Sequence, residues 1–287
     1  MQKIERISNR VLYLPPYQET DRPILAAIKG AKKTLLIDAG NSSKHANLFL
    51  KQLEDVHIKG DYLVLTHSDW DHVFGMSAMN IPTIAHYKTH KKIKRLQNLS
   101  WEDKFLDQRV KEGIEIPFCA EAIKKELGHQ REVFLPIPDI TFDKQMSINL
   151  GEVTAVIEHV GGDHADDCIV IYIPEEKALF LGDCMYANLY SKKWSYTIKN
   201  TLQLVKQLEK YDADIFFLSH HDKPVYKEEF QMKINFLKDT AFLTETYKGN
   251  EKAITKELVK RLQRKLNAEE MEIINFFANG YQIERFE

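Results

Sequence analysis

The chain has few features that would cross-link it or attach it to a membrane. Its three cysteines, Cys119, Cys168 and Cys184, are an odd number at no zinc-ribbon spacing. Neither a disulfide framework nor a structural cysteine-zinc site is indicated. No apolar stretch reaches about 18 residues, and the first residues form no apolar leader. We therefore expect no membrane partner and a location in the reducing cytoplasm.

The chain also lacks an excess of either charge. Its 40 Lys plus Arg stand against 42 Asp plus Glu, a formal charge of −2 over 287 residues. A nearly neutral chain has no general electrostatic attraction for nucleic acid, so no nucleic-acid partner is expected. The length suits one large domain or two small ones with a substantial core.

The most informative segment is 66–72, which reads Thr-His-Ser-Asp-Trp-Asp-His directly after the apolar run 62–65. Polar side chains at a strand end project into the crevice where α/β folds commonly place their chemistry. Imidazoles together with carboxylates suit divalent first-row metals. A polar turn that caps a helix is the alternative, because Asp is a good N-cap residue. The segment offers four candidate ligands: His67, Asp69, Asp71 and His72.

Further candidates lie beside three later apolar runs. His164 precedes the run 168–173, Asp183 follows 178–181, and a pair of histidines at 220–221 follows 215–218. The whole order resembles the metallo-β-lactamase superfamily, whose hallmark is His-x-His-x-Asp-His followed by separate His, Asp and His positions. The resemblance spans roughly residues 5–235.

The resemblance implies a binuclear site with Asp183 bridging two divalent ions. His67, Asp69 and His164 would hold one ion, and Asp71, His72 and His221 the other. We prefer His221 to His220 because a family motif places Pro after the ligand His and two further residues, as Pro224 stands here. Asp38 matches a family position that supports a ligand His from behind, and a turn-forming role is its alternative.

Asp69 stands where the family usually has its second His. Carboxylate is a harder ligand than imidazole and favours Mn or Fe, although Zn also accepts Asp. Zinc is the expected metal, with iron and manganese as alternatives. Two divalent ions with three carboxylates carry a formal charge of +1, one unit less than with His at position 69. We expect a less acidic bound water and weaker binding of anionic substrates.

The resemblance implies a metallo-hydrolase that uses a metal-bound hydroxide to cleave a small-molecule ester, lactone, thioester, amide, β-lactam or phosphodiester. Asp71 is the candidate catalytic residue. Tyr186 and Tyr190 are candidate oxyanion donors or leaving-group acids, unless they serve packing. One alternative is a diiron oxidoreductase related to flavodiiron proteins, which also have a carboxylate in place of the second His. These usually carry Glu there and a flavin domain, for which the tail of this chain is too short. A metal-bearing binding protein without turnover is the other alternative.

Hydrophobic periodicity predicts an α/β fold, with strands at 10–14, 24–28 and 34–37 and a helix at 43–53 before the strand at 62–65. The resemblance implies a four-layer αβ/βα sandwich over residues 1–235, with a helical, lid-like insertion at about 88–147. Residues 236–287 form a helical C-terminal extension of the same domain. Helices are expected at 89–96, 120–127, 227–247, 252–266 and 268–278, the last ending at the stop signal Asn279-Gly280.

Two features leave their role open at this stage. The C-terminal extension could cover the sheet, cap the site or form a homodimer surface through Phe276-Phe277. Trp101, Phe105 and Phe118 in the insertion are candidate walls of the substrate pocket, and ordinary core or subunit contacts are their alternative.

Overall fold

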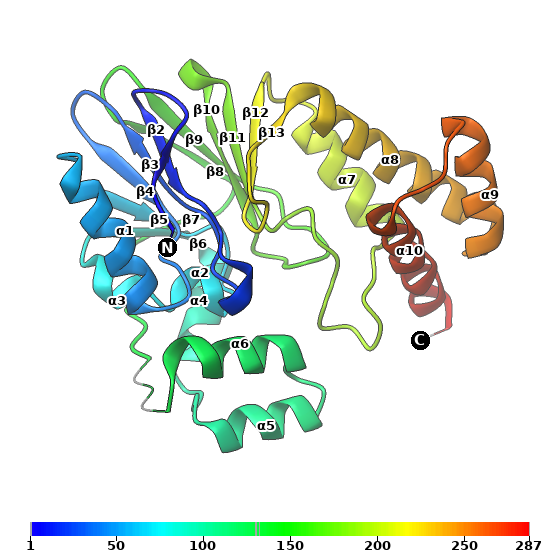
Figure 1. The fold of residues 1–287 in the computed structure, drawn as a ribbon, viewed down its shortest axis with the longest axis horizontal. Helices are drawn as coiled ribbons and strands as arrows, with labels where there is room; N and C mark the ends of the chain where they lie inside the picture. Colours follow the sequence, from blue (N-terminus) through cyan, green and yellow to red (C-terminus); the bar gives the residue numbers. More distant parts are fainter. Residues whose placement is uncertain (1, 130, 132, 287) are drawn as a thin grey trace.

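Two β-sheets lie face to face between two layers of helices (Figure 1). The computed structural model describes residues 2–129, 131 and 133–286. The predicted α/β class and the four-layer αβ/βα sandwich are both confirmed.

The first sheet contains the N-terminal strands and is antiparallel at one edge and parallel at the other. Strands β1 to β4 pair antiparallel in sequence order, and β4 to β7 pair parallel. The predicted strands near 10–14, 24–28, 34–37 and 62–65 are all present. The bounds are β1 Glu5–Arg6, β2 Val11–Leu14, β3 Leu25–Lys29, β4 Thr34–Ile37, β5 Tyr62–Val64, β6 Thr83–His86 and β7 Ile140–Phe142.

The second sheet follows in the chain, in the order β13-β12-β11-β10-β9-β8. Among the described strand pairs of this second sheet, only β11–β12 is parallel. Helix α7 Ile198–Leu208 forms the crossover that joins these two parallel strands. The bounds are β8 Gln145–Asn149, β9 Thr154–His159, β10 Ile169–Ile173, β11 Ala178–Gly182, β12 Ile215–Leu218 and β13 Val225–Tyr226.

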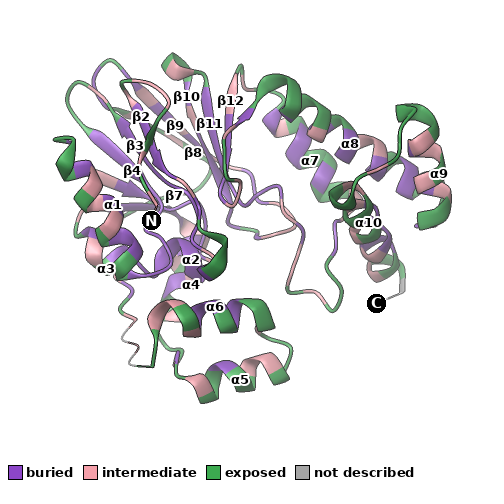
Figure 2. Cartoon of the chain, in the orientation of Figure 1, coloured by how far each residue is buried: buried purple, intermediate pink, exposed green. Residues whose placement is uncertain are grey.

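Strands in the middle of this sandwich are buried on both faces (Figure 2). In β2, Val11 and Tyr13 pack in the core between the sheets, whereas Leu12 and Leu14 pack toward the helices. Successive side chains on a strand point to opposite faces, so a strand covered on both sides needs an unbroken apolar run. The helices on the outer side of the first sheet are α1 Ser43–Asp55, α2 Trp70–Val73, α3 Met76–Met79 and α4 Tyr87–Leu96.

The segment 88–147 is only partly helical. It holds most of α4, then α5 Asp103–Lys111 and α6 Pro117–Leu127, but β7 and most of β8 also fall within it. Figure 1 places α5 and α6 beyond the edge of the first sheet. The Arg22 guanidinium lies 2.6 Å from the Glu126 carboxylate in a largely buried ion pair. This contact fixes α6 against the loop that follows the short 3-10 helix Gln18–Thr20.

The C-terminal helices are α8 Lys227–Thr246, α9 Glu251–Leu262 and α10 Ala268–Phe286. Helix α8 packs on the second sheet together with α7, and α10 packs against α7, α8 and α9. Within the part of the chain that the structure describes, no helix is long and apolar enough to cross a membrane.

The prediction that the last helix ends at Asn279-Gly280 is wrong, because α10 continues to Phe286. A Cβ at Gly280 would lie 1.9 Å from the carbonyl oxygen of Tyr196. Glycine is required here for the close approach of the helix to that loop. The tertiary contact outweighs the weak helix propensity of glycine, which is worth only about 1 kcal/mol.

Candidate metal centre

The predicted ligands come together at one end of the sandwich, where strands of both sheets end. The segment 66–72 follows β5, and its second half forms the start of α2. Asp183 follows β11 directly, and His220 lies two residues after β12. His164 lies in the loop that precedes β10.

Backbone contacts hold these loops together. The Ile169 N–H donates a hydrogen bond to the carbonyl oxygen of Thr66 at 2.9 Å, which links the second sheet to the end of the first. Gly182 has a positive φ of 51°, and a Cβ there would lie 2.8 Å from the Cβ of Thr66. Glycine permits both the left-handed backbone and the close approach. Asp183 is thereby brought beside the segment 66–72.

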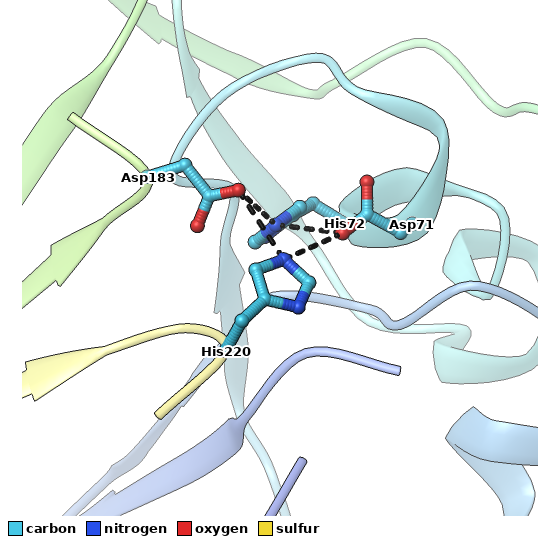
Figure 3. Close-up of side chains that lie close together, drawn as sticks. All are labelled: Asp71, His72, Asp183 and His220. Carbon is cyan, nitrogen blue, oxygen red and sulfur yellow. Dashed lines mark ion pairs between the residues drawn. The ribbon is translucent and has the colours of Figure 1, made fainter. Parts of the chain in front are cut away.

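The ligand-capable atoms form two adjacent groups, and within each group they all lie within 4.8 Å of one another. Figure 3 shows the first group, with the four side chains pointing toward a common centre. The first group is Asp71, His72, Asp183 and His220, and the second is His67, Asp69 and His164.

Asp183 lies between the two groups. Its Oδ2 atom faces the Nε2 atoms of four histidines, two from each group. The distances are 3.3 Å to His220, 3.5 Å to His72, 3.6 Å to His164 and 3.9 Å to His67. This central position is the one that the resemblance implied for a bridging carboxylate.

The donor set fits divalent metal ions. Five buried ligand-capable atoms have no hydrogen-bond partner among the described residues: the Nε2 atoms of His67, His72 and His164, Asp71 Oδ2 and Asp183 Oδ1. Leaving such atoms unsatisfied costs roughly 1–3 kcal/mol each. Two ligands of a tetrahedral zinc ion stand about 3.4 Å apart. The distances between histidine Nε2 and aspartate Oδ2 atoms are close to this value. They are 3.5 Å for His67–Asp69, 3.1 Å for His164–Asp69, 3.1 Å for His72–Asp71 and 3.2 Å for His220–Asp71.

The choice of His221 over His220 is corrected by the structure. His220 Nε2 belongs to the first group, whereas His221 lies outside both groups. The His221 N–H donates a hydrogen bond to the Leu218 carbonyl in a turn, and the His221 side chain lines the cavity beside the two groups without belonging to either. His220 is the histidine nearer to the strand end, and that proximity is the sequence signal that identifies it.

Two acidic side chains lie behind histidines of the first group. Asp38 Oδ2 lies 2.8 Å from His72 Nδ1, and the same carboxylate accepts hydrogen bonds from the N–H and hydroxyl of Thr66. This contact is the one that the expected support role of Asp38 requires. Asp21 Oδ1 lies 3.4 Å from His220 Nδ1. Sequence reasoning missed Asp21, because the segment Asp-Arg-Pro reads as a turn.

The electrostatics of the cluster favour a cation at its centre. Burial alone would raise the pKa of Asp183, but the neighbouring His220 and His72 imidazoles hold that pKa well below its usual value. Burial alone would lower the pKa of His164, because it disfavours the charged imidazolium, but the Asp69 carboxylate raises that pKa to about 9. The carboxylates thus stay ionised and attract positive charge, which protons or metal ions can supply.

A cavity of about 380 Å³ opens on both groups. Of the predicted wall residues, Phe118 lines it, whereas Trp101 is buried in the first core against Phe74 and Phe105 is exposed outside the cavity. Tyr186 and Tyr190 also line it. The Tyr186 hydroxyl is buried and has no side-chain hydrogen-bond partner among the described residues.

The comparisons with known proteins agree with this geometry. The family model described as metallo-beta-lactamase superfamily matches residues 26–220, more than half of the chain. Among curated proteins, none matches the sequence.

Several solved structures share the fold at low sequence identity. A metallo-beta-lactamase from Pontibacter korlensis is 17% identical with a TM-score of 0.57, covering 82% of this chain and 98% of its own. A stereoselective inverting sec-alkylsulfatase from Pseudomonas sp. is 17% identical with a TM-score of 0.69, covering 100% of this chain. This chain spans only 51% of that sulfatase. A metallo beta lactamase from Erythrobacter litoralis is 16% identical with a TM-score of 0.56, covering 81% of this chain and 94% of its own.

Proposed function

Because this chain belongs to the metallo-β-lactamase superfamily, we propose that it is a hydrolase with a binuclear metal centre. The observation that carries the proposal is the position of Asp183, whose Oδ2 faces histidines of both ligand groups. One carboxylate between two ligand sets is what two neighbouring ions require.

The residues divide into two ligand sets that share Asp183. His67, Asp69 and His164 would hold one ion, and Asp71, His72 and His220 the other. Zinc is the proposed metal, with iron and manganese as alternatives, because imidazole and carboxylate suit all three. When bound, the ions would lower the pKa of water and polarise the scissile group.

The protein side chains have separate tasks in this reaction. Asp38 would fix the ring orientation of His72 so that its Nε2 atom faces the centre, and Asp21 lies 3.4 Å behind Nδ1 of His220. Asp71 lines the cavity and is proposed to orient the attacking water as well as to serve as a ligand. Tyr186 would donate a hydrogen bond to the developing oxyanion, because its hydroxyl group is buried beside the ligand groups and donates to no side chain among the described residues.

The test compares Asp183→Asn with Asp222→Asn, a control in the loop of His220 whose side chain is exposed and outside both ligand groups. We expect two ions per wild-type chain and hydrolysis of at least one class among esters, lactones, thioesters, amides, β-lactams and phosphodiesters. Asp183→Asn should lower bound metal and reduce kcat/KM by about 100-fold or more, while the control retains both. Full metal content and full activity in Asp183→Asn would contradict the proposal.

The carboxylate of Asp69 favours a second candidate function, that of a diiron oxidoreductase. This carboxylate lies 3.1 Å from His164 and 3.5 Å from His67, so the second group has an oxygen ligand that suits iron. A diiron oxidoreductase would be coloured as purified, contain iron and respond to reductant. Zinc-supported hydrolysis without such a response would dismiss it.

A further inference from the structure

A second and larger cavity lies beside the metal centre. Its volume is about 790 Å³, within the range of roughly 300–1,000 Å³ typical of small-molecule sites. Its walls come from α8, α10 and the loop between β11 and α7, which run close together in Figure 1. Much of the wall is apolar and includes Leu189, Trp194, Met232, Phe236 and Phe276.

The two cavities are adjacent. Four residues, Tyr186, Leu189, Trp194 and His221, line both the large cavity and the cavity of about 380 Å³ over the candidate metal ligands. For a molecule with its reactive group at the metal centre, the way into the large cavity leads past these shared residues. His221, which belongs to neither ligand group, is one of the residues that both cavities share.

Apart from the proposed metal ions, the side-chain charges at the two cavities do not favour an anion. Among the described residues lining the cavity at the metal centre there is no Lys or Arg, and Asp21 adds a carboxylate to those of the ligands. In the large cavity the cations Lys233 and Arg264 are each paired, with Glu269 and Glu270. Neither cavity thus offers an unpaired lysine or arginine for a sulfate, phosphate or carboxylate.

We propose that the large cavity binds the alkyl chain of the substrate, and that the substrate is an uncharged carboxylic ester or lactone. This inference rests on the proposed hydrolase function and names its substrate class. The oxygen of water bonds to the acyl carbon, the acyl C–O bond breaks, and the leaving oxygen takes a proton. An ester yields a carboxylic acid, which ionises, and an alcohol, whereas a lactone yields both groups in one hydroxy acid. Burial of each methylene group contributes about 0.8 kcal/mol, so binding should strengthen with chain length.

The experiment uses p-nitrophenyl acetate, butyrate and octanoate with the metal-loaded protein. The variant Met232→Glu places a charge in the cavity wall at a residue that is 65% exposed, so the fold should tolerate it. The matched control is Phe242→Glu, because Phe242 is 63% exposed on the same helix but outside the cavity. We expect kcat/KM to be about tenfold or more higher for octanoate than for acetate. Met232→Glu should lower this ratio at least about fivefold, and Phe242→Glu should keep it.

Binding of 1-decanol to metal-free protein, measured by calorimetry, separates the two proposals. Decanol binding that Met232→Glu weakens, without hydrolysis of any ester, would support the cavity assignment and contradict the hydrolase. Hydrolysis with no chain-length preference and no decanol binding would overturn the cavity assignment and leave the hydrolase standing. Faster cleavage of octyl sulfate than of the octanoate ester would overturn the uncharged substrate. A dimer that dissociates in Met232→Glu and binds no decanol would show that a second copy fills the cavity, which also overturns the assignment.

Discussion

The Asp38 carboxylate lies 2.8 Å from Nδ1 of His72, a residue 34 positions later in the chain. The same carboxylate holds the backbone N–H of Thr66, so one side chain fixes both the start of the ligand segment and the orientation of its last histidine. A carboxylate accepts hydrogen bonds, so Nδ1 is the donor toward Asp38, and Nε2 faces Asp71 and Asp183, where it would bind an ion.

Replacing Asp38 with Asn should weaken metal binding by about 10- to 100-fold, as loss of such a partner typically does. Asn is the suitable replacement because Asp38 has a φ of 61° and Asn also adopts the left-handed region. Competition with a chelator measures the Kd. Asp61→Asn, at a carboxylate that pairs with Lys33 away from the site, should leave the Kd unchanged. An unaltered affinity in Asp38→Asn would show that His72 needs no such support.

The neighbouring histidines should respond differently to removal. His220→Ala should lower the metal content from two ions per chain toward one, because His220 Nε2 lies 3.2 Å from Asp71 and 3.3 Å from Asp183. His221→Ala should retain both ions, since His221 lies outside the ligand groups. Elemental analysis of both purified variants distinguishes them. The opposite ranking would restore His221 as the ligand.

Asp69→His should make the centre one charge unit more positive. A more positive centre acidifies bound water, so the acidic limb of the kcat/KM profile should move to lower pH. Inorganic phosphate should also inhibit several-fold more strongly. A profile and an inhibition constant identical to those of the wild type would show that the charge of Asp69 does not set the acidity of the centre.

His86 should make the fold less stable in mild acid. Burial and the adjacent His159 imidazole lower the pKa of His86 from its ordinary 6.5 to about 4. The unfolded chain therefore binds more protons between these values, so the free energy of unfolding rises with pH across this window and falls on acidification. Between pH 7.5 and 5 the loss from this residue should be about 2 kcal/mol.

Urea unfolding of wild type and His86→Gln at both pH values tests this prediction. Glutamine can still donate to the Asp143 carbonyl, which His86 Nε2 contacts at 2.7 Å, but it does not titrate. The variant should therefore lose about 2 kcal/mol less than the wild type on acidification. Equal losses in the two proteins would mean that His86 is not responsible.

The sequence by itself determined the α/β class, and it identified most of the candidate ligands. Unbroken apolar runs such as 11–14 identify strands buried on both faces, and polar residues directly after them mark the strand ends. The segment 66–72 could be recognised as a source of candidate ligands because its polar side chains are close in sequence and its local conformation brings them together. These candidates are His67, Asp69, Asp71 and His72. Asp183 could be read because it follows its strand immediately.

Only the tertiary structure decided the features that depend on contacts between distant segments. The turn after β12 selects His220, Asp21 reaches the site from a loop about 200 residues earlier in the chain, and the contact of Gly280 with Tyr196 carries α10 through a local stop signal. The large cavity likewise needs helices and a loop from separate parts of the chain. Periodicity reports the environment of a residue along its own element, whereas these features arise from the packing of one element against another.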